Sequence, residues 1–417
     1  MSKLQPVKGT RDILPEDWSK YLEINESFIK VGRLFGFSMV EIPVFEFTRV
    51  FSRSLGDATD IVTKEMYTFE DKGGEQITLR PEGTAGLVRA FLSNGLTRST
   101  PVKFLYSGPM FRYERPQKGR YRQFYQLGAE LIGAATAQAD IETLSMAERF
   151  LTEIGLTGKY QLEINSIGDT ESRNRFRESL VDYFSKYKTE LSKESQERLE
   201  KNPMRILDSK QDEDQKFLLE APELKAALNK ESSEFFDTVL EGLTKLGVDF
   251  KINPRLVRGL DYYCHTVFEF TTDQLGSQNA ILSGGRYDGL VQLLGGPETP
   301  GIGFAAGTDR LALLLDKETS NSNTVHVIPL NKDHQTTALE ASHILRNSQI
   351  PCEMAYSGNL SKRLTKAQKQ NAPFALIVSA NDAGESRYEL KDLETGEQSE
   401  LSLDQAIGKI DQKILKL

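Results

Sequence analysis

Two adjoining strand-like segments constrain the fold of this 417-residue chain more than any other feature. VKFLYSGPMFRYE spans residues 102–114, YRQFYQLGAELIG spans 121–133, and the basic, glycine-containing segment RPQKGR lies between them. Two strand-like runs joined by a short segment that contains glycine are typical of a β-hairpin. The sequence therefore predicts an antiparallel strand pair with an unusually charged tip.

The second of these strands has two chemically different faces, because side chains alternate along a strand. The alternate positions from Tyr125 to Leu131 are apolar and are expected to pack on a core. The opposite face carries Gln126 and Glu130, with Gly128 between them leaving space. A strand that turns a polar face to solvent would show the same pattern, so this strand alone leaves a binding site and an exposed surface equally open.

Arg112 and Glu114 share one face of the first strand. If the hairpin forms, this arginine can converge with Gln126 and Glu130 on one concave sheet. An arginine fork binds phosphate or carboxylate groups through two parallel hydrogen bonds, which makes Arg112 well suited to a phosphate ligand. A salt bridge between Arg112 and Glu114 within the strand is compatible with that role.

The turn RPEG at residues 80–83 separates a short strand, QITL, from a predicted helix. We expect this helix to begin with Thr84 as its N-cap. Glu82 lies in the turn, where the N-terminal amides of the helix stabilise a carboxylate. Glu82 is therefore either a helix-start acid and nothing more, or part of a site.

Charge and composition exclude several classes of protein. The formal net charge of -8 argues against a general nucleic-acid coat, although the windows 112–122 and 361–371 are locally basic. Either window alone is more typical of a solvated helix face or loop. The two cysteines and four histidines show no spacing typical of metal ligands, so no structural metal is expected. No apolar run is long enough to span a membrane, and no signal sequence is recognised, which indicates a soluble, cytoplasmic protein.

The order of predicted elements divides the chain into several parts. A helix is expected at 15–35, and residues 171–245 change to a charged composition with helical periodicity, as in an inserted helical domain. Strand-like segments return from Val257 to Phe270. The glycine-rich GIGFAAGT is expected to be a strand that leads into a helix, without the GxGxxG spacing of a nucleotide fingerprint. After a polar linker, SNSNT, strands and helices alternate, which predicts a small α/β domain with a largely parallel sheet.

Several of these segments together resemble the signature motifs of class II aminoacyl-tRNA synthetases, in the order in which that class has them. The three motifs are GFSMVEIP with Pro43, FRYERPQKGRYRQF with Arg112, and GIGFAAGTDRL with Arg310. In the third, Thr308 and Asp309 stand where relatives more often have Leu and Glu. LVRGLDYYCHTVFEF and LSGGRYDGL are similar to the two stretches that mark the histidyl-tRNA synthetase family within the class, and NPMRILDSK resembles a segment of its insertion. The resemblance runs from KGTRDILP through the C-terminal α/β domain.

The resemblance assigns a histidine site to the polar face of the sheet. Glu82, Thr84 and Gln126 match residues that hold the α-amino end of the substrate. Glu130 and Tyr263 match residues that hydrogen-bond the imidazole, and a carboxylate and a phenol can together satisfy an imidazole. The full histidine set implied is Glu82, Thr84, Arg112, Gln126, Glu130, Arg258, Tyr262, Tyr263 and Tyr287.

The resemblance gives the arginines the catalytic role. Arg112 and Arg258 match residues that reach the α-phosphate of ATP from opposite sides, and Arg310 matches one at the γ-phosphate. Two fixed guanidinium groups suit attack of the histidine carboxylate on that phosphorus, since negative charge then builds on the phosphate oxygens. Mg²⁺ is expected to bind with the ATP. The ATP set implied is Arg112, Glu114, Arg258 and Arg310.

The resemblance further implies the partners and the architecture. Arg115 and Gln117 in the hairpin tip match a region that contacts the acceptor end of tRNA. Lys362 and Arg363 lie in the domain that would read the anticodon. The expected fold is α+β, with an antiparallel-sheet catalytic domain of the class II synthetase kind, a helical insertion and a C-terminal α/β anticodon-binding domain, in a homodimer. The expected bounds are 1–170 and 246–319 for the catalytic core, 171–245 for the insertion and 325–417 for the last domain.

The reaction implied is the ATP-dependent ligation of L-histidine to tRNA(His) through a histidyl-adenylate, with release of AMP and diphosphate. Two other functions stay open. Regulatory subunits of ATP phosphoribosyltransferase resemble synthetases and sense histidine, but they usually lack the anticodon-binding domain and lose catalytic residues. This chain has residues 325–417 and keeps Arg112, Arg258 and Arg310. A tRNA-sensing module without catalysis is opposed by the same arginines.

Overall fold

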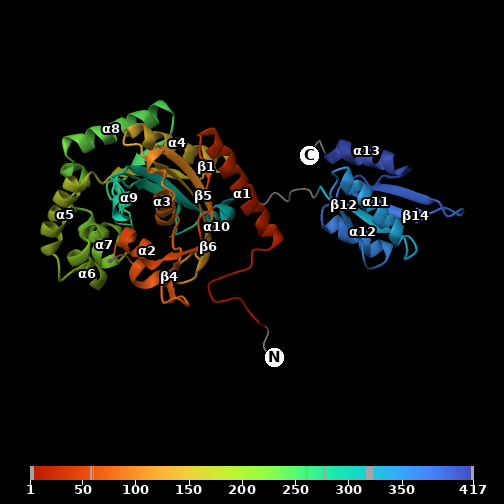
Figure 1. The fold of residues 1–417 in the computed structure, drawn as a ribbon, viewed down its shortest axis with the longest axis horizontal. Helices are drawn as coiled ribbons and strands as arrows, with labels where there is room; N and C mark the ends of the chain where they lie inside the picture. Colours follow the sequence, from red (N-terminus) through yellow and green to blue (C-terminus); the bar gives the residue numbers. More distant parts are fainter. Residues whose placement is uncertain are drawn as a thin grey trace. The chain divides into compact units, whose positions relative to one another are not determined.

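The chain divides into two compact units, Met1–Asp316 and Lys317–Leu417 (Figure 1). Residues 320–322 of the predicted linker lie outside the described residues, as do Gly259 and Asp261 of the predicted strand that starts at Val257. Within the described part of the chain, no helix has the length and apolarity required to cross a bilayer. The computed structural model describes residues 4–56, 59, 61–258, 260, 262–276, 279–315 and 323–414.

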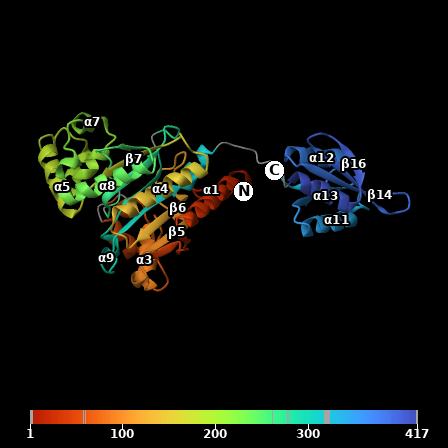
Figure 2. The same ribbon diagram turned by 90° about the horizontal axis from the view of Figure 1, so that it is seen from above.

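An eight-stranded, predominantly antiparallel sheet organises the first unit (Figures 1 and 2). The predicted hairpin is confirmed, since β5 (Val102–Phe111) and β6 (Gln123–Ile132) pair antiparallel. The other strands are β1 (Ser38–Met39), β7 (Gln161–Ser166), β8 (Phe250–Ile252), β9 (Cys264–Thr271), β10 (Ala280–Arg286) and β11 (Gly301–Gly307). The strand order β1-β5-β6-β11-β10-β9-β7-β8 places β11 and β10 next to the hairpin, so segments far apart in the sequence become neighbours.

Helices cover one face of this sheet and form the main core of the unit (Figure 2). The predicted apolar face of β6 is confirmed for Leu127, Ala129 and Leu131, which are buried in this core, but not for Tyr125, which is only partly buried and lies outside it. Period-two alternation then turns Gln126 and Glu130 to the opposite face of the sheet. The covering helices are α1 (Pro15–Leu34), α4 (Ala137–Glu153), α8 (Lys230–Lys245) and α10 (Thr308–Leu314).

The opposite face of the sheet carries a second core and a small additional sheet. Val88 and Phe91 of the helix that follows the RPEG turn pack there with Tyr106 and Met110 of β5. The elements on this side are α2 (Thr48–Leu55), α3 (Thr84–Ser93), α9 (Leu290–Leu293) and the three-stranded sheet of β2 (Phe45–Phe47), β4 (Gln76–Leu79) and β3 (Tyr67–Glu70).

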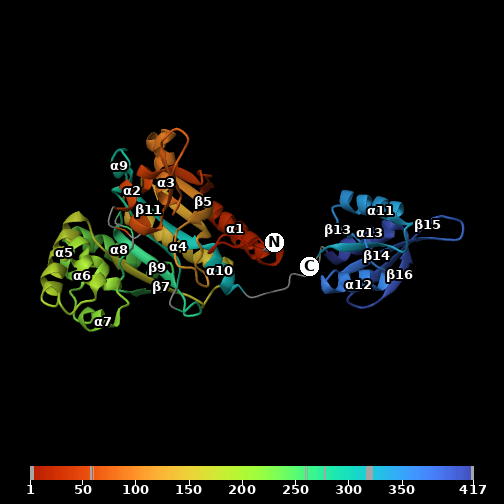
Figure 3. The same cartoon turned by 90° about the horizontal axis from the view of Figure 1, so that it is seen from below.

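Helices between β7 and β8 occupy the segment 171–245 and gather at one side of the unit (Figure 3). Each of the longer ones starts with a side-chain cap, for example Asp169, whose carboxylate accepts the backbone N–H of Ser172 at 2.8 Å. Such caps satisfy the free amides of a helix start. The elements are α5 (Thr170–Ser185), α6 (Lys193–Lys201), α7 (Asp212–Leu218), α8 and the short 3₁₀ helices Pro203–Asp208 and Leu224–Ala227.

The predicted strand from Val257 to Phe270 is wrong in its first half, because β9 begins only at Cys264. Among the described residues before it, Leu256 and Tyr263 lie in a loop, and side chains bond their carbonyls. Asn165 donates to the carbonyl oxygen of Leu256 at 3.0 Å, and Arg173 donates to that of Tyr263 at 2.8 Å. At these two carbonyls, side chains supply the hydrogen bonds that a neighbouring strand would supply in a β-ladder.

The second unit contains a five-stranded sheet in the order β13-β12-β14-β15-β16, which is parallel in only half of its pairings. The largely parallel sheet that we predicted is therefore wrong. The connection from β14 to β15 is a tight turn, in which the N–H of Asn381 bonds the carbonyl of Glu385 at 2.9 Å, and so short a connection joins antiparallel strands. The strands are β12 (Val325–Pro329), β13 (Cys352–Met354), β14 (Phe374–Ala380), β15 (Ser386–Asp392) and β16 (Gln398–Leu401), and the helices are α11 (Gln335–Asn347), α12 (Leu360–Lys369) and α13 (Leu403–Ile414).

A fully buried ion pair joins β10 to the start of α4. Both Arg286 and Asp140 have no exposed side-chain surface, and Arg286 Nε donates to Asp140 Oδ1 at 3.0 Å. Arg286 Nη1 also donates to Asp288 at 3.0 Å and to the carbonyl of Ala134 at 3.1 Å. Without Asp140, the buried charge of Arg286 keeps only Asp288, whose side chain is 36% exposed, as its counter-charge.

Asp140→Ala is expected to lower the free energy of unfolding of the first unit by about 3 to 5 kcal/mol, because Arg286 would stay buried and charged. Lys30→Ala removes the ion pair between an exposed lysine and Glu153, and it should cost less than about 1 kcal/mol. Urea unfolding followed by the fluorescence of Trp18, the only tryptophan and part of α1, measures both variants. Equal losses in the two variants would contradict this account of the pair.

Candidate active site

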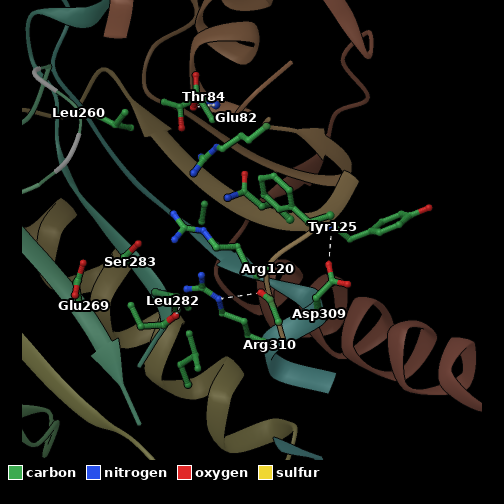
Figure 4. A pocket seen from close by; sticks show the side chains of 18 of the residues that line it. Glu82, Thr84, Arg120, Tyr125, Leu260, Glu269, Leu282, Ser283, Asp309 and Arg310 are labelled. Carbon is green, nitrogen blue, oxygen red and sulfur yellow. Dashed lines mark hydrogen bonds between the residues drawn. The ribbon is translucent and has the colours of Figure 1, made fainter. Parts of the chain in front are cut away.

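A cavity of about 270 Å³ lies among the β5–β6 hairpin, the loop before β9, and the ends of β10 and β11 (Figure 4). Most of the residues that the sequence singled out line it, although they come from widely separated segments. Glu130 and Tyr287 are not among the lining residues and lie behind them. The predicted residues that line the cavity are Glu82, Thr84, Arg112, Glu114, Gln126, Arg258, Tyr262, Tyr263 and Arg310.

Arg258 forms part of the cavity wall, with 15% of its side chain exposed. One Nη atom donates to Ser283 Oγ at 2.9 Å, and the guanidinium also forms an ion pair with Glu269. Its Cζ atom lies 5.7 Å from the ring centroid of Tyr263. The side chain is therefore fixed by β9 and β10, although the residue itself belongs to a loop.

Arg112 and Arg310 are anchored to backbone carbonyls elsewhere around the cavity. Arg112 Nε donates to the carbonyl of Pro81 at 2.8 Å. Arg310 Nη1 donates to the carbonyl of Ala280 at 2.7 Å. Burial lowers the pKa of Arg310, and the nearby positive charges of Arg120 and Arg112 lower this pKa further. Like charges held together in a partly buried cavity favour the binding of a multiply charged anion.

Glu82 caps the helix that lines one end of the cavity, and the prediction of Thr84 as the N-cap is wrong. The N-cap residue is Gly83, and Thr84 is the first residue of α3. The carboxylate of Glu82 accepts the backbone N–H groups of Thr84 at 2.7 Å and Ala85 at 2.8 Å. Since Thr84 already lies inside the helix, its hydroxyl is free of capping and donates to Glu130 Oε1 at 2.7 Å.

Glu130 lies immediately behind the cavity and is almost completely buried. Its second oxygen, Oε2, accepts the hydroxyl proton of Tyr287 at 2.5 Å. Burial raises the pKa of Glu130 to about 8, against the hydrogen bonds from Tyr287 and Thr84, which lower it. A Cβ atom at Gly303 would lie 1.8 Å from Glu130 Oε2, so the glycine-rich strand β11 makes room for this carboxylate. Any larger residue at position 303 would therefore collide with the Glu130 side chain.

Tyr262 and Tyr263 close the cavity on the side of the loop. Their ring centroids are 4.6 Å apart, and the ring of Tyr287 lies edge-on to Tyr262 at 5.9 Å. Burial raises the pKa of Tyr263, so its hydroxyl keeps its proton. The phenols therefore provide hydrogen-bond groups next to the carboxylate of Glu130.

Several residues of the cavity were missed from the sequence, among them Glu269 and Ser283, which bond Arg258. Arg120 forms an ion pair with Glu114, and the ring of Phe124 lies 5.3 Å below Arg112. Asp309 accepts the backbone N–H of Tyr125 at 2.8 Å (Figure 4). The available signals were the position of Arg120 in the basic hairpin tip and that of Phe124 on the same strand face as Gln126.

The residues predicted to contact tRNA are divided between the hairpin tip and the second unit, and Arg115 and Gln117 do not line the cavity. Arg115 and Gln117 are exposed in the hairpin tip, where Gln117 forms an isolated bridge with Arg120. In the second unit, Lys362 is exposed on α12, while Arg363 donates to the carbonyl of Pro329. The structure thus presents Lys362 to solvent and uses Arg363 partly to hold its own backbone.

The raised pKa of Glu130 predicts a pH-dependent stability. Between about pH 4.5 and pH 8 the folded protein keeps a proton on this carboxyl that the unfolded chain releases, so a rise in pH across this range lowers the free energy of unfolding. Glu130→Gln removes this titration. The melting temperature of the variant minus that of the unmodified protein should rise from about pH 5 to about pH 8 and then level off.

Thermal unfolding measured at several pH values tests this. Glu75→Gln, at an exposed position between β3 and β4, is the matched control and should show a constant difference. A difference that is equally constant for Glu130→Gln would show that Glu130 titrates in its ordinary range in the folded protein.

Known proteins of one family match this chain along nearly its whole length. The family model described as histidyl-tRNA synthetase matches residues 9–311, and the model described as an anticodon binding domain matches residues 324–413. The histidine–tRNA ligase of Gluconacetobacter diazotrophicus is 48% identical over 404 residues, which cover 97% of each chain. That of Rhodospirillum rubrum is 47% identical over 404 residues with the same coverage.

A solved structure agrees with these matches. The apo histidyl-tRNA synthetase of S. aureus superimposes with a TM-score of 0.80 at 32% identity, covering 98% of this chain and 100% of that one. The fold of both units, the antiparallel sheet with its helical insertion and the α/β unit that follows, is therefore that of a class II synthetase with an anticodon-binding domain. From its sequence and its fold, the chain belongs to the histidyl-tRNA synthetase family.

Proposed function

We propose that the protein ligates L-histidine to tRNA(His) with ATP, through a histidyl-adenylate, and that the cavity of Figure 4 is where the adenylate forms. The observation that carries the proposal is the convergence of Arg112, Arg258 and Arg310 beside the buried pair of Glu130 and Tyr287. A triphosphate requires several fixed cations, and an imidazole requires a donor and an acceptor. Histidine–tRNA ligases that share nearly the full length of this chain support the same reaction.

In the first step, a carboxylate oxygen of histidine attacks the α-phosphorus of ATP, and the bond from that phosphorus to diphosphate breaks. Negative charge builds on the oxygens of the α-phosphate, where Arg112 and Arg258 would donate hydrogen bonds. Both are already anchored, Arg112 by Pro81 and Arg258 by Ser283, so little reorganisation accompanies the reaction. Arg310 would hold the far end of the triphosphate, with Glu114 nearby on the hairpin.

In the second step, a hydroxyl of the terminal ribose of tRNA attacks the carbonyl carbon of the adenylate, and AMP leaves with its phosphate oxygen. No side chain forms a covalent bond in either step. Arg115 and Gln117 in the exposed hairpin tip would meet the acceptor end, and Lys362 and Arg363 of the second unit the anticodon. Binding through these basic groups should weaken as salt rises.

Recognition of histidine is assigned to the polar groups at the floor of the cavity. Glu82, Thr84 and Gln126 would hold the α-amino group. Glu130, directly behind the cavity lining, and Tyr263 would bond the imidazole, because a protonated Glu130 carboxyl offers a donor and further lone pairs beyond the hydrogen bonds from Thr84 and Tyr287. An amino acid without these nitrogens would leave the buried groups unpaired, which discriminates by about 10,000-fold or more.

Mg²⁺ would bind together with ATP, through carboxylates of the cavity and phosphate oxygens. In the described residues no group of three or more His, Cys, Asp or Glu side chains could hold a metal, whereas the carboxylates of Glu114 and Glu269 line the cavity. One or two carboxylates together with phosphate oxygens are the usual ligands of Mg²⁺. These two glutamates would hold it, and the ion would neutralise phosphate charge.

A homodimer and a cytoplasmic location complete the proposal. Exposed apolar side chains cluster around the motif that contains Pro43, and a surface of this kind favours association with another protein surface. They are Met39 (42% exposed), Val44 (37%), Phe45 (51%) and Phe47 (41%). In the class to which this motif belongs, it contributes to a dimer interface.

Arg258→Ala is expected to lower the rate of histidine transfer to tRNA(His) by about 100- to 1000-fold, because it removes a fixed donor from the transition state. Arg255→Ala, an exposed arginine of the same loop, is the matched control and should charge tRNA at close to the unmodified rate. Radiolabelled histidine measures charging, and calorimetry measures how much histidine binding each variant keeps.

Equal charging by the Arg258 and Arg255 variants would refute the transition-state role. An unmodified protein that binds histidine but charges no tRNA would instead favour the regulatory-subunit function, which senses histidine without ligation.

A further inference from the structure

A thin wall separates the active-site cavity from the helical insertion. Arg258, Leu260 and Tyr263 line the cavity on one side, and the same three residues line a second, much smaller space of about 20 Å³ on the other. That space has room for one or two water molecules. The insertion is therefore packed directly against the back of the loop that carries Arg258 and Tyr263.

Arg173 of helix α5 crosses this narrow space to the wall. Its Nη1 atom donates to the backbone carbonyl of Tyr263 at 2.8 Å. A charged donor to a carbonyl is among the stronger hydrogen bonds in proteins. Tyr263 lies in the loop just before β9, and among the hydrogen bonds of the described residues it is Arg173 that holds this carbonyl.

The turn of α5 that carries Arg173 is itself held firmly. The carboxylate of Asp169 accepts the N–H of Ser172 at 2.8 Å and the side-chain amide of Asn229 at 2.7 Å. Asn229 in turn caps α8 by accepting the N–H of Ser232 at 2.8 Å. Hydrogen bonds thus join the N-terminus of α5 to that of α8, and Arg173 extends from the first turn of α5 that these bonds hold in place.

We propose that Arg173 is a positioning residue for Tyr263, so that the helical insertion completes the histidine site. The inference rests on the proposed function, because it takes Tyr263 as the phenol that bonds the imidazole. Without Arg173, the carbonyl of Tyr263 loses its partner and the backbone can rotate, which moves the ring. Arg258 depends less on this contact, since its guanidinium is held by Ser283 and Glu269 on strands.

Arg173→Met is the variant that tests this, because methionine keeps the apolar stem and removes every donor. The Michaelis constant for histidine in ATP–pyrophosphate exchange should rise about tenfold, the loss expected for one charged hydrogen bond. The constant for ATP should change less than about twofold, since Arg112 and Arg310 are anchored to Pro81 and Ala280. Arg173→Lys, which restores a charged donor, should recover most of the affinity for histidine.

Arg175→Met is the matched control on the same helix. Its side chain is 46% exposed and lies 3.7 Å from Glu171, so neither Michaelis constant should change. A Michaelis constant for histidine in Arg173→Met that equals that of the Arg175 variant would overturn the proposal. So would an equal rise in the constants for histidine and ATP, because that is the effect of a general loss of structure.

Two further measurements cover the cases in which the unmodified protein shows no exchange or the Arg173→Met variant does not fold. If the unmodified protein shows no exchange, the proposed function fails, and calorimetric titration of histidine alone then decides the role of Arg173 by the same tenfold comparison. If Arg173→Met does not fold, Arg173→Gln replaces it. Its amide ends two bonds short of the Nη1 position, so the same weakening is expected, and unchanged histidine binding would overturn the proposal.

Discussion

The placement of several guanidinium groups around one partly buried cavity is the constraint on which the rest of the structure depends. Arg112, Arg258 and Arg310 repel one another and lose hydration there. Fixed hydrogen-bond acceptors offset this cost for each guanidinium group. Carbonyls of Pro81 and Ala280 and the hydroxyl of Ser283 supply these acceptors. The acceptors come from separate strands and turns, and only the antiparallel order of the large sheet brings them together. The fold can thus be understood as the scaffold that keeps the guanidinium groups in place before an anion arrives.

The layer behind the cavity depends on close packing around a buried carboxylate. Glu130 needs two hydroxyl donors, Thr84 and Tyr287, and space that only glycine leaves. A Cβ atom at Gly303 would meet Glu130 Oε2, and one at Gly284 would lie 2.1 Å from the carbonyl of Gly303. The glycines of β10 and β11 therefore allow polar groups to be buried under the site. They do not form a phosphate-binding loop.

Local sequence patterns predicted those structural features that are determined by residues close together in the chain. Alternation along β6 separated its core face from its site face from Gln126 onward, although Tyr125, predicted for the core, lines the cavity. The charged hairpin was identified from its turn. Contacts between segments far apart in the sequence could not be predicted from such local patterns. Thr84 was predicted to cap α3, but the carboxylate of Glu82 bonds the free amides of that helix. The hydroxyl of Thr84 instead donates to Glu130, which lies on a distant strand. The loop before β9 has strand-forming residues, but side chains of β7 and α5 bond its carbonyls at Leu256 and Tyr263, where a neighbouring strand would in a ladder. The roles of the site residues came from the resemblance, and the geometry explains how each is held.

The most direct test of the central claim is pyrophosphate exchange into ATP by the unmodified protein, measured with each of the twenty common amino acids. The account predicts exchange with histidine alone, because Glu130 and the tyrosines beside it are satisfied only by an imidazole and the anchored arginines then act on the α-phosphate. Exchange with no amino acid, or equal exchange with an amino acid that lacks an imidazole, would contradict it.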